Sequence, residues 1–170
     1  MFYQLVHSSI FNRSTQSLML LFQVHKTSQN VPDRYYRALY ERLTAPDLHH
    51  ASKISMFLNL LYRSVNGDSN TTRVYAFLKR SLQVCSLAKP SLICGILYLV
   101  SEVIKNRPKL WTCIQQPEEA SSVEVAAGDD TPHQGEYDPF KREPQYSRAD
   151  ESCLWEIVRI RPLSPPLFAH

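Results

Sequence analysis

Two adjacent histidines that follow an aspartate are the residues of this sequence best suited to catalysis or metal binding. Asp47, His49 and His50 offer a carboxylate and two imidazoles, groups that coordinate zinc and transfer protons in many enzymes. No further ligand lies at a spacing typical of a zinc site, and the chain has no nucleophile motif and no glycine-rich phosphate loop. We therefore interpret the three as polar residues at a helix boundary. The sequence predicts a protein without catalytic residues, metal, cofactor or small-molecule substrate.

Cysteine chemistry has no better support, because the four cysteines are unevenly spaced and form no CxxC pair. Three lie in apolar helical contexts, so we expect reduced, buried thiols and an intracellular protein. The four are Cys85, Cys94, Cys113 and Cys153. The N-terminus lacks the basic region of a signal peptide. The longest apolar run, residues 92–100, is too short to span a bilayer, and we expect no membrane partner.

The chemistry that remains is the binding of an anion by basic side chains. The candidates are Arg73, Lys79, Arg80, Lys105, Arg107, Lys109, Lys141 and Arg142. If antiparallel packing gathers the first six on one face, that face could contact RNA phosphates with an affinity that falls steeply with salt. The alternatives are solubility charges, complements to a helix C-terminus for Lys105 and Arg107, and internal ion pairs for Lys141 and Arg142.

Charge is strongly segregated along the chain, although the whole has a formal net charge of only +3. Residues 1–114 carry a net +9, residues 115–138 a net −7 and residues 139–170 a net +1. A basic body followed by an acidic spacer favours an anionic partner, or an acidic strip that shields the basic face. An ordinary solvated surface is the alternative.

Hydrophobic periodicity predicts an all-helical body to position these residues. The expected helices span about 14–26, 33–43, 52–64, 72–87 and 90–106. The fourth buries Val74, Phe77, Leu78 and Leu82, with Arg73, Lys79 and Arg80 elsewhere on its circumference. The fifth is apolar nearly all round, so it should be central in the fold.

Beyond the body, the sequence predicts a disordered acidic loop over 115–136 and a segment that returns to the body from residue 137. A last helix is expected over 149–160. Two prolines limit the unfolded entropy of the return segment, and its large aromatic residues serve as structural anchors. These anchors are Tyr137, Phe140, Tyr146 and Trp155. Trp155 is alternatively a hot spot for a partner protein.

Successive helices begin 18 to 20 residues apart and are joined by short turns, so helix pairs form units of about 40 residues, as in armadillo and HEAT repeats. Because no residue pattern recurs, we predict an irregular α-solenoid of helical hairpins, with a compact helical bundle as the alternative. The expected organisation is a helical body at 1–114, the acidic loop at 115–136, the docking segment at 137–160 and a proline-rich tail at 161–170.

Six ordered blocks of the sequence resemble the CCAAT-binding-factor domain family. The blocks are SLMLLFQV, DRYYRALYERL, SKISMFLNLLYRSV, RVYAFLKRSLQV, ICGILYLVSEVIKNRP and YDPFKREPQYSRADESCLWEI. The resemblance implies an α-helical repeat scaffold that acts in the nucleus, in the nucleolus, during assembly of the large ribosomal subunit. It also implies a heterodimer with a second nucleolar complex protein, binding to pre-ribosomal RNA, and no catalytic residue.

An older interpretation of the same resemblance is transcription regulation at CCAAT promoters, which would make promoter DNA a partner. The sequence has no helix-turn-helix signature, zinc finger or basic zipper for reading a major groove. Two departures from the family pattern also stand out: Met1 falls inside the expected early helices, and the tail VRIRPLSPPLFAH lacks the family's histidines before LFA. We expect a truncated or divergent relative, and a protein interaction module without an RNA role is the third hypothesis.

Overall fold

The computed structural model describes residues 2–28, 31–111 and 137–160. Across these ranges the fold is all-helical and contains no strand, as the sequence predicts. The elements are α1 (Phe2–Val6), α2 (Phe11–Thr27), α3 (Asp33–Leu43), η1 (Pro46–His50), α4 (Ile54–Asn66), α5 (Thr71–Cys85), α6 (Pro90–Asn106), η2 (Pro108–Trp111), η3 (Pro144–Tyr146), η4 (Ala149–Glu151) and α8 (Glu156–Arg159), where η marks a 3₁₀ turn. None of the helices so described has the length and apolar character needed to cross a bilayer. The acidic segment 115–136 and the tail 161–170 lie outside the described residues.

Helix boundaries follow local capping chemistry where the sequence supplies it. The side chain of Asn70 caps α5 by accepting from the backbone N–H of Arg73 at 3.2 Å. Pro90 occupies the first turn of α6, where its missing N–H costs nothing. Ser14 is buried within α2 and donates to the carbonyl of Val6 at 2.6 Å. That bond attaches the short α1, which periodicity did not predict.

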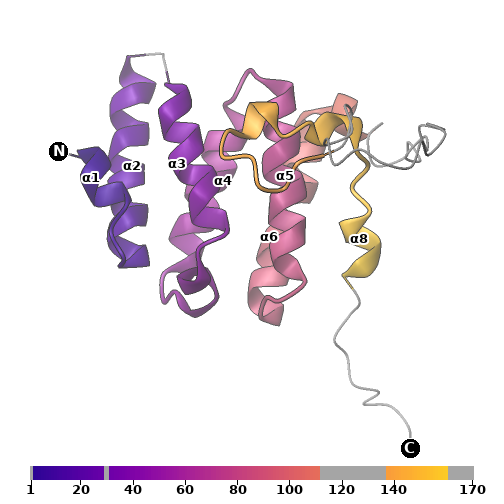
Figure 1. Ribbon diagram of the computed structural model, residues 1–170, viewed down its shortest axis with the longest axis horizontal. Helices are drawn as coiled ribbons and strands as arrows, with labels where there is room; N and C mark the ends of the chain where they lie inside the picture. Colours follow the sequence, from indigo (N-terminus) through magenta and orange to yellow (C-terminus); the bar gives the residue numbers. More distant parts are fainter. Residues whose placement is uncertain (1, 29–30, 112–136, 161–170) are drawn as a thin grey trace, which may run out of the picture.

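The helices pack in two rows. In one row α2 contacts α4 and α4 contacts α6, and in the other α3 contacts α5. Contacts of α2 with α3 and of α5 with α6 join the rows, and Figure 1 shows the helices standing side by side. Aromatic pairs join neighbouring helices within each row. Tyr40 meets Phe77 edge to face at 5.2 Å between ring centroids, and Phe11 meets Phe57 in the same way at 5.1 Å.

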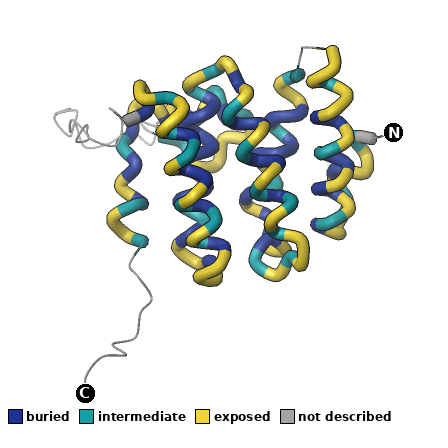
Figure 2. The backbone as a smooth tube through the Cα atoms, turned by 180° about the vertical axis from the view of Figure 1, so that it is seen from behind, coloured by how far each residue is buried: buried dark blue, intermediate teal, exposed yellow. Residues whose placement is uncertain are grey.

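The central helix is α5, not the more apolar α6 that the sequence predicts as central. Every residue of α5 from Arg73 to Leu82 is buried. The reason is that residues 137–160 cross α5, so that η3, η4 and α8 all contact it (Figure 1). By contrast, α6 exposes Cys94 and Tyr98, and the ring of Tyr98 is 69% accessible. Figure 2 shows buried residues along the inner faces of the rows and exposed residues along the outer faces.

The prediction of a single helix over 149–160 is wrong. The segment forms the turn η4, an extended residue at Ser152 (φ −119°, ψ 142°) and the four-residue α8. Its buried apolar residues explain the break, because Ala149 and Leu154 both enter the core. At about 100° per residue, a continuous helix would place Leu154 about 140° around the axis from Ala149. The extended step lets both side chains face α5.

Candidate functional site

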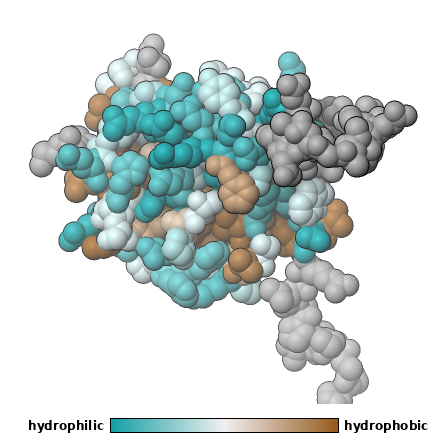
Figure 3. All heavy atoms as spheres, viewed as in Figure 1, coloured by the Kyte–Doolittle hydropathy of each residue, from teal (hydrophilic) through white to brown (hydrophobic). Residues whose placement is uncertain are grey.

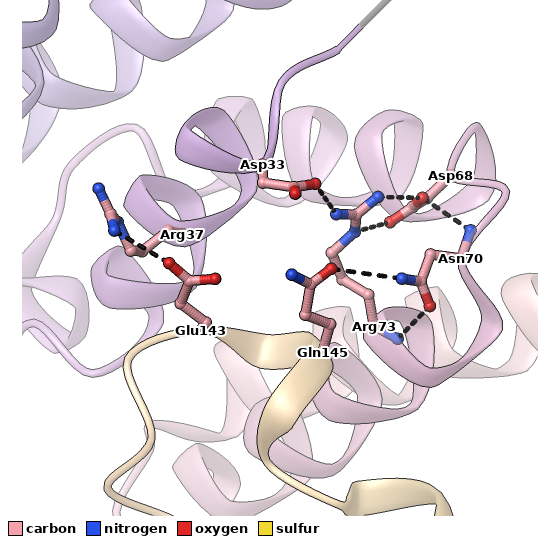
Figure 4. Close-up of polar contacts among 7 residues, drawn as sticks. All are labelled: Asp33, Arg37, Asp68, Asn70, Arg73, Glu143 and Gln145. Atoms are coloured by element: carbon pink, nitrogen blue, oxygen red, sulfur yellow. Dashed lines mark hydrogen bonds and ion pairs between the residues drawn. The ribbon is translucent and has the colours of Figure 1, made fainter.

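Arg73, the first of three buried cations on α5, ties α3 to the turn between α4 and α5. Its guanidinium donates to both carboxylate oxygens of Asp68, at 2.5 and 2.8 Å, and to Asp33 at 2.5 Å. It also lies 4.0 Å from the centroid of the Tyr36 ring. Figure 4 shows the contacts of Arg73 with Asp33 and Asp68. The planar guanidinium of an arginine suits such bidentate pairing. The contacts of Arg73 with Asp33, Asp68 and Tyr36 all lie within the chain.

The return segment docks beside this cluster through two further polar contacts. Glu143 pairs with Arg37 of α3 at 3.0 Å, and the side-chain amide of Asn70 donates to Gln145 at 3.5 Å (Figure 4). These bonds hold η3 against the N-terminal end of α5.

Lys79, the second cation, is 1% exposed and fixes the far end of the return segment. Its ammonium lies 3.1 Å from Glu156, which is also buried, and donates to the carbonyl of Cys153 at 2.8 Å. It also lies 5.0 Å from the centroid of the Tyr137 ring. A buried ion pair with these additional bonds is satisfied internally, which leaves Lys79 unavailable to a ligand.

Arg80, the third cation, holds the turn at the start of the return segment. Its guanidinium lies 3.7 Å from the centroid of the Tyr40 ring and donates to the carbonyl of Pro139. The residue is 7% exposed, yet no carboxylate of the described residues lies within ion-pair distance of it. Buried charges normally have an oppositely charged partner, so among the described residues the positive charge of Arg80 is unmatched.

Burial shifts the pKa of three tyrosines on α3, Tyr35, Tyr36 and Tyr40. Burial raises the pKa of Tyr36 to about 12, and the nearby Asp68 carboxylate adds to the shift while Arg73 opposes it. Burial likewise raises the pKa of Tyr35 and Tyr40, and in Tyr40 the charge of Arg80 opposes the shift. These hydroxyls are therefore neutral at physiological pH and provide packing rather than acid–base chemistry.

The predicted aromatic anchors divide into two kinds. Tyr137 is half-buried and donates to Gln83 of α5 at 3.1 Å. The rings of Phe140 and Tyr146 are 91% and 62% exposed, so they do not anchor the segment, and Trp155 is 41% exposed. Burial in the segment comes instead from Pro144, Ser147, Ala149, Leu154 and Glu156. The aromatic residues were predicted as anchors because of their size, but the turn geometry points two of them outward.

A pocket of about 340 Å³ opens between α3, α5 and the turn that begins the return segment. We call it the α3–α5 pocket. It is lined by Arg37, Tyr40, Glu41, Thr44, Arg80, Pro139, Phe140, Lys141 and Arg142. The structure thus brings together three of the predicted basic residues, Arg80, Lys141 and Arg142. The molecular face drawn in Figure 3 is largely hydrophilic, with scattered hydrophobic residues between.

The cations of the α3–α5 pocket differ in how far they are neutralised. Arg37 is paired with Glu143, and Lys141 lies 3.6 Å from Asp138 in an exposed pair. Arg142 is exposed and makes no ion pair within the described parts of the chain. Glu41 is the one acidic residue of the lining. Together with the unmatched Arg80, the pocket offers cations to an anionic ligand and one carboxylate acceptor beside them.

Of the five other predicted basic residues, Arg73 and Lys79 are buried on α5, and the remaining three lie at the end of α6, away from this pocket. Arg107 donates to the backbone carbonyls of Asn66, at 2.9 Å, and Asp68. Lys105 pairs with Glu102 at 2.7 Å, and the hydrogen bond to that carboxylate raises the pKa of Lys105. Lys109 is exposed. The single basic face proposed from the sequence is therefore divided between the pocket, the α6 end and the interior.

Sequence reasoning missed the α3 wall of the pocket, although a signal for it exists. The residues of that wall follow i, i+3, i+4, i+7 spacing, which places them on one helical face. They are Arg37, Tyr40, Glu41 and Thr44. No residue of this face was predicted from the sequence to contact a ligand.

The described residues offer no candidate site for metal binding or thiol chemistry. No group of three histidine, cysteine, aspartate or glutamate residues there could hold a metal ion. His49 and His50 lie in η1, at the helix boundary expected for them. Burial raises the pKa of the Cys85 thiol to about 11, so this cysteine is an unreactive core residue. Cys94 is exposed, contrary to the expectation of buried thiols, and Cys113 lies outside the described ranges.

Comparison with known proteins places this arrangement in context. The model of the CBF/Mak21 family matches residues 14–166. The ribosome biogenesis protein NOC1 of Chaetomium thermophilum is 38% identical over 99% of this chain and 17% of its own length. The CCAAT/enhancer-binding protein zeta of Mus musculus is 34% identical over 93% of this chain and 20% of its own length.

A more distant relative, the nucleolar complex protein 1 of Drosophila melanogaster, is 28% identical over 88% of this chain and 13% of its own length. No solved structure matches the chain. The chain thus spans a fifth or less of the length of these relatives.

Proposed function

Because the chain belongs to the CBF/Mak21 family, we propose that it is a noncatalytic helical scaffold that binds protein partners and pre-ribosomal RNA during assembly of the large ribosomal subunit. The names of two relatives support this role, one as a ribosome biogenesis protein and one as a nucleolar complex protein. The location that follows is the nucleus, and within it the nucleolus. The protein partner of the proposal is a second nucleolar complex protein, with which this chain forms a heterodimer.

We further infer that the two rows of helices are a section of an irregular α-solenoid. In each row a helix contacts its neighbours in the row, and the rows are joined by contacts between successive helices, as in stacked hairpins. A scaffold of this kind presents long surfaces to partners. The acidic stretch 115–138, with a net charge of −7, then serves as a spacer between the body and its docking segment.

The observation that carries the RNA-binding proposal is the α3–α5 pocket. Among the described residues, the exposed Arg142 has no ion pair and the buried Arg80 has no carboxylate partner, so this part of the chain leaves the pocket positively charged toward a ligand. Phosphates are the anions that RNA supplies at every nucleotide, and contacts to them dominate affinity.

The test is RNA binding measured as a function of salt. The purified 170-residue chain and a fluorescent single-stranded RNA are titrated at several salt concentrations, and the logarithm of the association constant is plotted against that of the salt concentration. Lys141→Ser together with Arg142→Ser should lower the slope by about 1.4, since each phosphate contact to a single strand contributes about 0.7. The matched control is Lys53→Ser with Lys89→Ser, which removes two exposed cations outside the pocket lining. An equal slope in wild type and pocket variant would contradict this surface.

The scaffold proposal has its own test in cells. The tagged chain, expressed at native levels, should accumulate in nucleoli and sediment with pre-ribosomal particles, together with a second nucleolar complex protein. Sedimentation of the chain only as free protein would contradict the role in ribosome assembly.

Two alternative functions are compatible with the same family, and the ligand that the chain binds distinguishes them. A role at CCAAT promoters is supported by the name of the mouse relative, and it requires tighter binding to a CCAAT duplex than to a scrambled duplex. A protein interaction module without an RNA role requires that the chain bind its partner protein but no RNA. Equal binding to both duplexes removes the first alternative, and salt-dependent RNA binding removes the second.

A further inference from the structure

We propose that the α3–α5 pocket binds one unpaired RNA nucleotide, with the base stacked on the ring of Phe140 and the adjacent phosphate held by Lys141 and Arg142. This inference rests on the proposed RNA-binding function and deepens it, because it specifies single-stranded RNA and a residue that contacts the base. Arg80 and Glu41 complete the site from the helical walls.

The first observation is an aromatic ring displayed to solvent on a fixed turn. Phe140 is 91% exposed, although it lies in a segment whose neighbours are docked onto α5. Its backbone N–H donates to the Asp138 carboxylate at 2.9 Å, and the N–H of Asp138 donates to the carbonyl of Ser147 at 2.9 Å. On the body side, Arg80 holds the carbonyl of Pro139. The ring is thus presented by a turn that is bonded at both ends, a preorganised surface for stacking.

The second observation is the polar complement around that ring. Lys141 and Arg142 directly follow Phe140, so a base on the ring has cations next to its own phosphate. The pair of Lys141 with Asp138 is 3.6 Å long and about half exposed, which makes Lys141 easy to redirect toward a ligand. Arg142 has no ion pair within the described residues that a ligand would need to break.

Glu41 favours a nucleotide over a simple anion. A carboxylate in a phosphate site repels a phosphate, whereas it accepts hydrogen bonds from a ribose hydroxyl or a base amino group. The lining therefore combines an aromatic face, cationic donors and one acceptor, which match the base, the phosphate and the sugar. Its volume of about 340 Å³ lies at the small end of the range for ligand sites, consistent with one nucleotide and not several.

An unpaired strand fits this geometry better than a duplex. In a double helix the faces of the bases are stacked on one another, so a protein aromatic reaches them only where the strand is open. Aromatic stacking in a basic groove is how proteins bind single strands with little sequence preference. We therefore expect discrimination between single-stranded and duplex RNA, with weak dependence on sequence.

The test compares Phe140→Leu with wild type in the full chain, using a fluorescent single-stranded 12-mer and a duplex of the same strand. Because stacking on one aromatic ring is worth about 1–3 kcal/mol, Phe140→Leu should weaken single-strand binding by about 5- to 150-fold. Phe140→Tyr, which keeps an aromatic ring, should bind the single strand with an affinity close to that of wild type. Wild type should bind the single strand more tightly than the duplex.

The matched control is Tyr146→Leu, which removes another exposed aromatic of the same segment outside the pocket lining. It should leave the affinity unchanged, and circular dichroism should show that all variants remain folded, since both rings are largely exposed. Salt-dependent RNA binding that is equal in Phe140→Leu and wild type, or equal for single strand and duplex, would overturn this inference while leaving the proposed function intact. Absence of any RNA binding by wild type would overturn both.

Discussion

The cations of α5 and the cations of the turn at 138–142 have the same chemistry but opposite placements. On α5, Arg73, Lys79 and Arg80 are each 7% exposed or less, and each is bonded to other parts of the chain. On the turn, Lys141 and Arg142 are exposed, and the second has no ion pair in the described residues. In the first group, Arg73 joins α3 to the turn before α5, and Lys79 and Arg80 hold the return segment to the body. The second group faces solvent beside the α3–α5 pocket.

This difference shows that a basic helix need not be a basic surface. The body residues 1–114 carry a net charge of +9, yet three of their positive charges lie inside the molecule. Lys79 and Arg80 lie there because the return segment crosses α5 and provides carboxylate and carbonyl acceptors for them, whereas Arg73 finds its acceptors, Asp68 and Asp33, within the body. Arg80 belongs to both regions, because it is buried but also lines the pocket. The comparison therefore predicts that substitutions on α5 affect stability, whereas substitutions on the turn affect ligand binding.

The largest expected effect is that of Lys79→Met. It leaves the carboxylate of Glu156 buried without its cation, and breaking a buried pair in this way typically costs about 3–5 kcal/mol. Urea unfolding monitored by circular dichroism measures the loss. The double variant Lys79→Met with Glu156→Gln should recover part of it, because no buried charge remains. A loss below about 1 kcal/mol, as for exposed pairs, would show that the return segment is not held by this ion pair.

A smaller loss is expected for Arg73→Lys. Lysine keeps the charge but cannot make the bidentate contact with Asp68 while also reaching Asp33, and each hydrogen bond to a charged group is worth about 1.5–3 kcal/mol. We expect a loss of about 2 kcal/mol in the free energy of unfolding. Arg37→Lys is the matched control, because the pair of Arg37 with Glu143 is more than a third exposed. Equal losses in the two variants would contradict a special role for the buried arginine.

The next effect is expected at alkaline pH, which should lower the free energy of unfolding through Tyr36, a residue in contact with the α5 cation Arg73. Since the pKa of Tyr36 is raised from 10.0 to about 12, the folded chain retains a proton that the unfolded chain releases. This stability is fully present below pH 10 and is lost as the pH rises from about 10 toward about 12, by about 1.4 kcal/mol per pH unit. Urea unfolding at pH 9, 10 and 11 tests this slope.

Tyr36→Phe should reduce that slope by one proton, whereas Tyr98→Phe, at an exposed position on α6, should leave it unchanged. A slope that is the same in Tyr36→Phe and wild type would show that Tyr36 does not titrate with unfolding.

Much of the helical body could be predicted from the sequence, because its helices are amphipathic and clearly bounded. α3 begins at Asp33 and ends before Thr44, and α6 extends from Pro90 to Asn106, as periodicity and the flanking residues indicate. What could not be predicted is which helix becomes central. That depends on where residues 137–160 dock, and contacts between positions some 70 residues apart leave no periodic signal in the sequence.

The same limit applies to the candidate site. Lys79 and Arg142 were both predicted as candidate cations for an anionic ligand, yet one is 1% exposed and the other lies on the surface. Phe140 was predicted as an anchor because large aromatic residues are usually buried, whereas the hydrogen bonds of its turn direct it outward. Burial of a charge or exposure of a ring is decided by tertiary contacts, so neither can be read from local propensity.

The smallest stability effect is expected on the turn. Lys141→Ser together with Arg142→Ser removes two exposed cations, of which only Lys141 has an ion pair, 3.6 Å long, within the described residues. Substitutions of this kind usually change the free energy of unfolding by less than about 0.5 kcal/mol, because exposed pairs are screened by solvent. Urea unfolding of this variant beside Lys79→Met checks the contrast directly. A loss of several kcal/mol would mean that the turn, like α5, holds the return segment in place, and the distinction between a structural and a ligand-facing set of cations would fail.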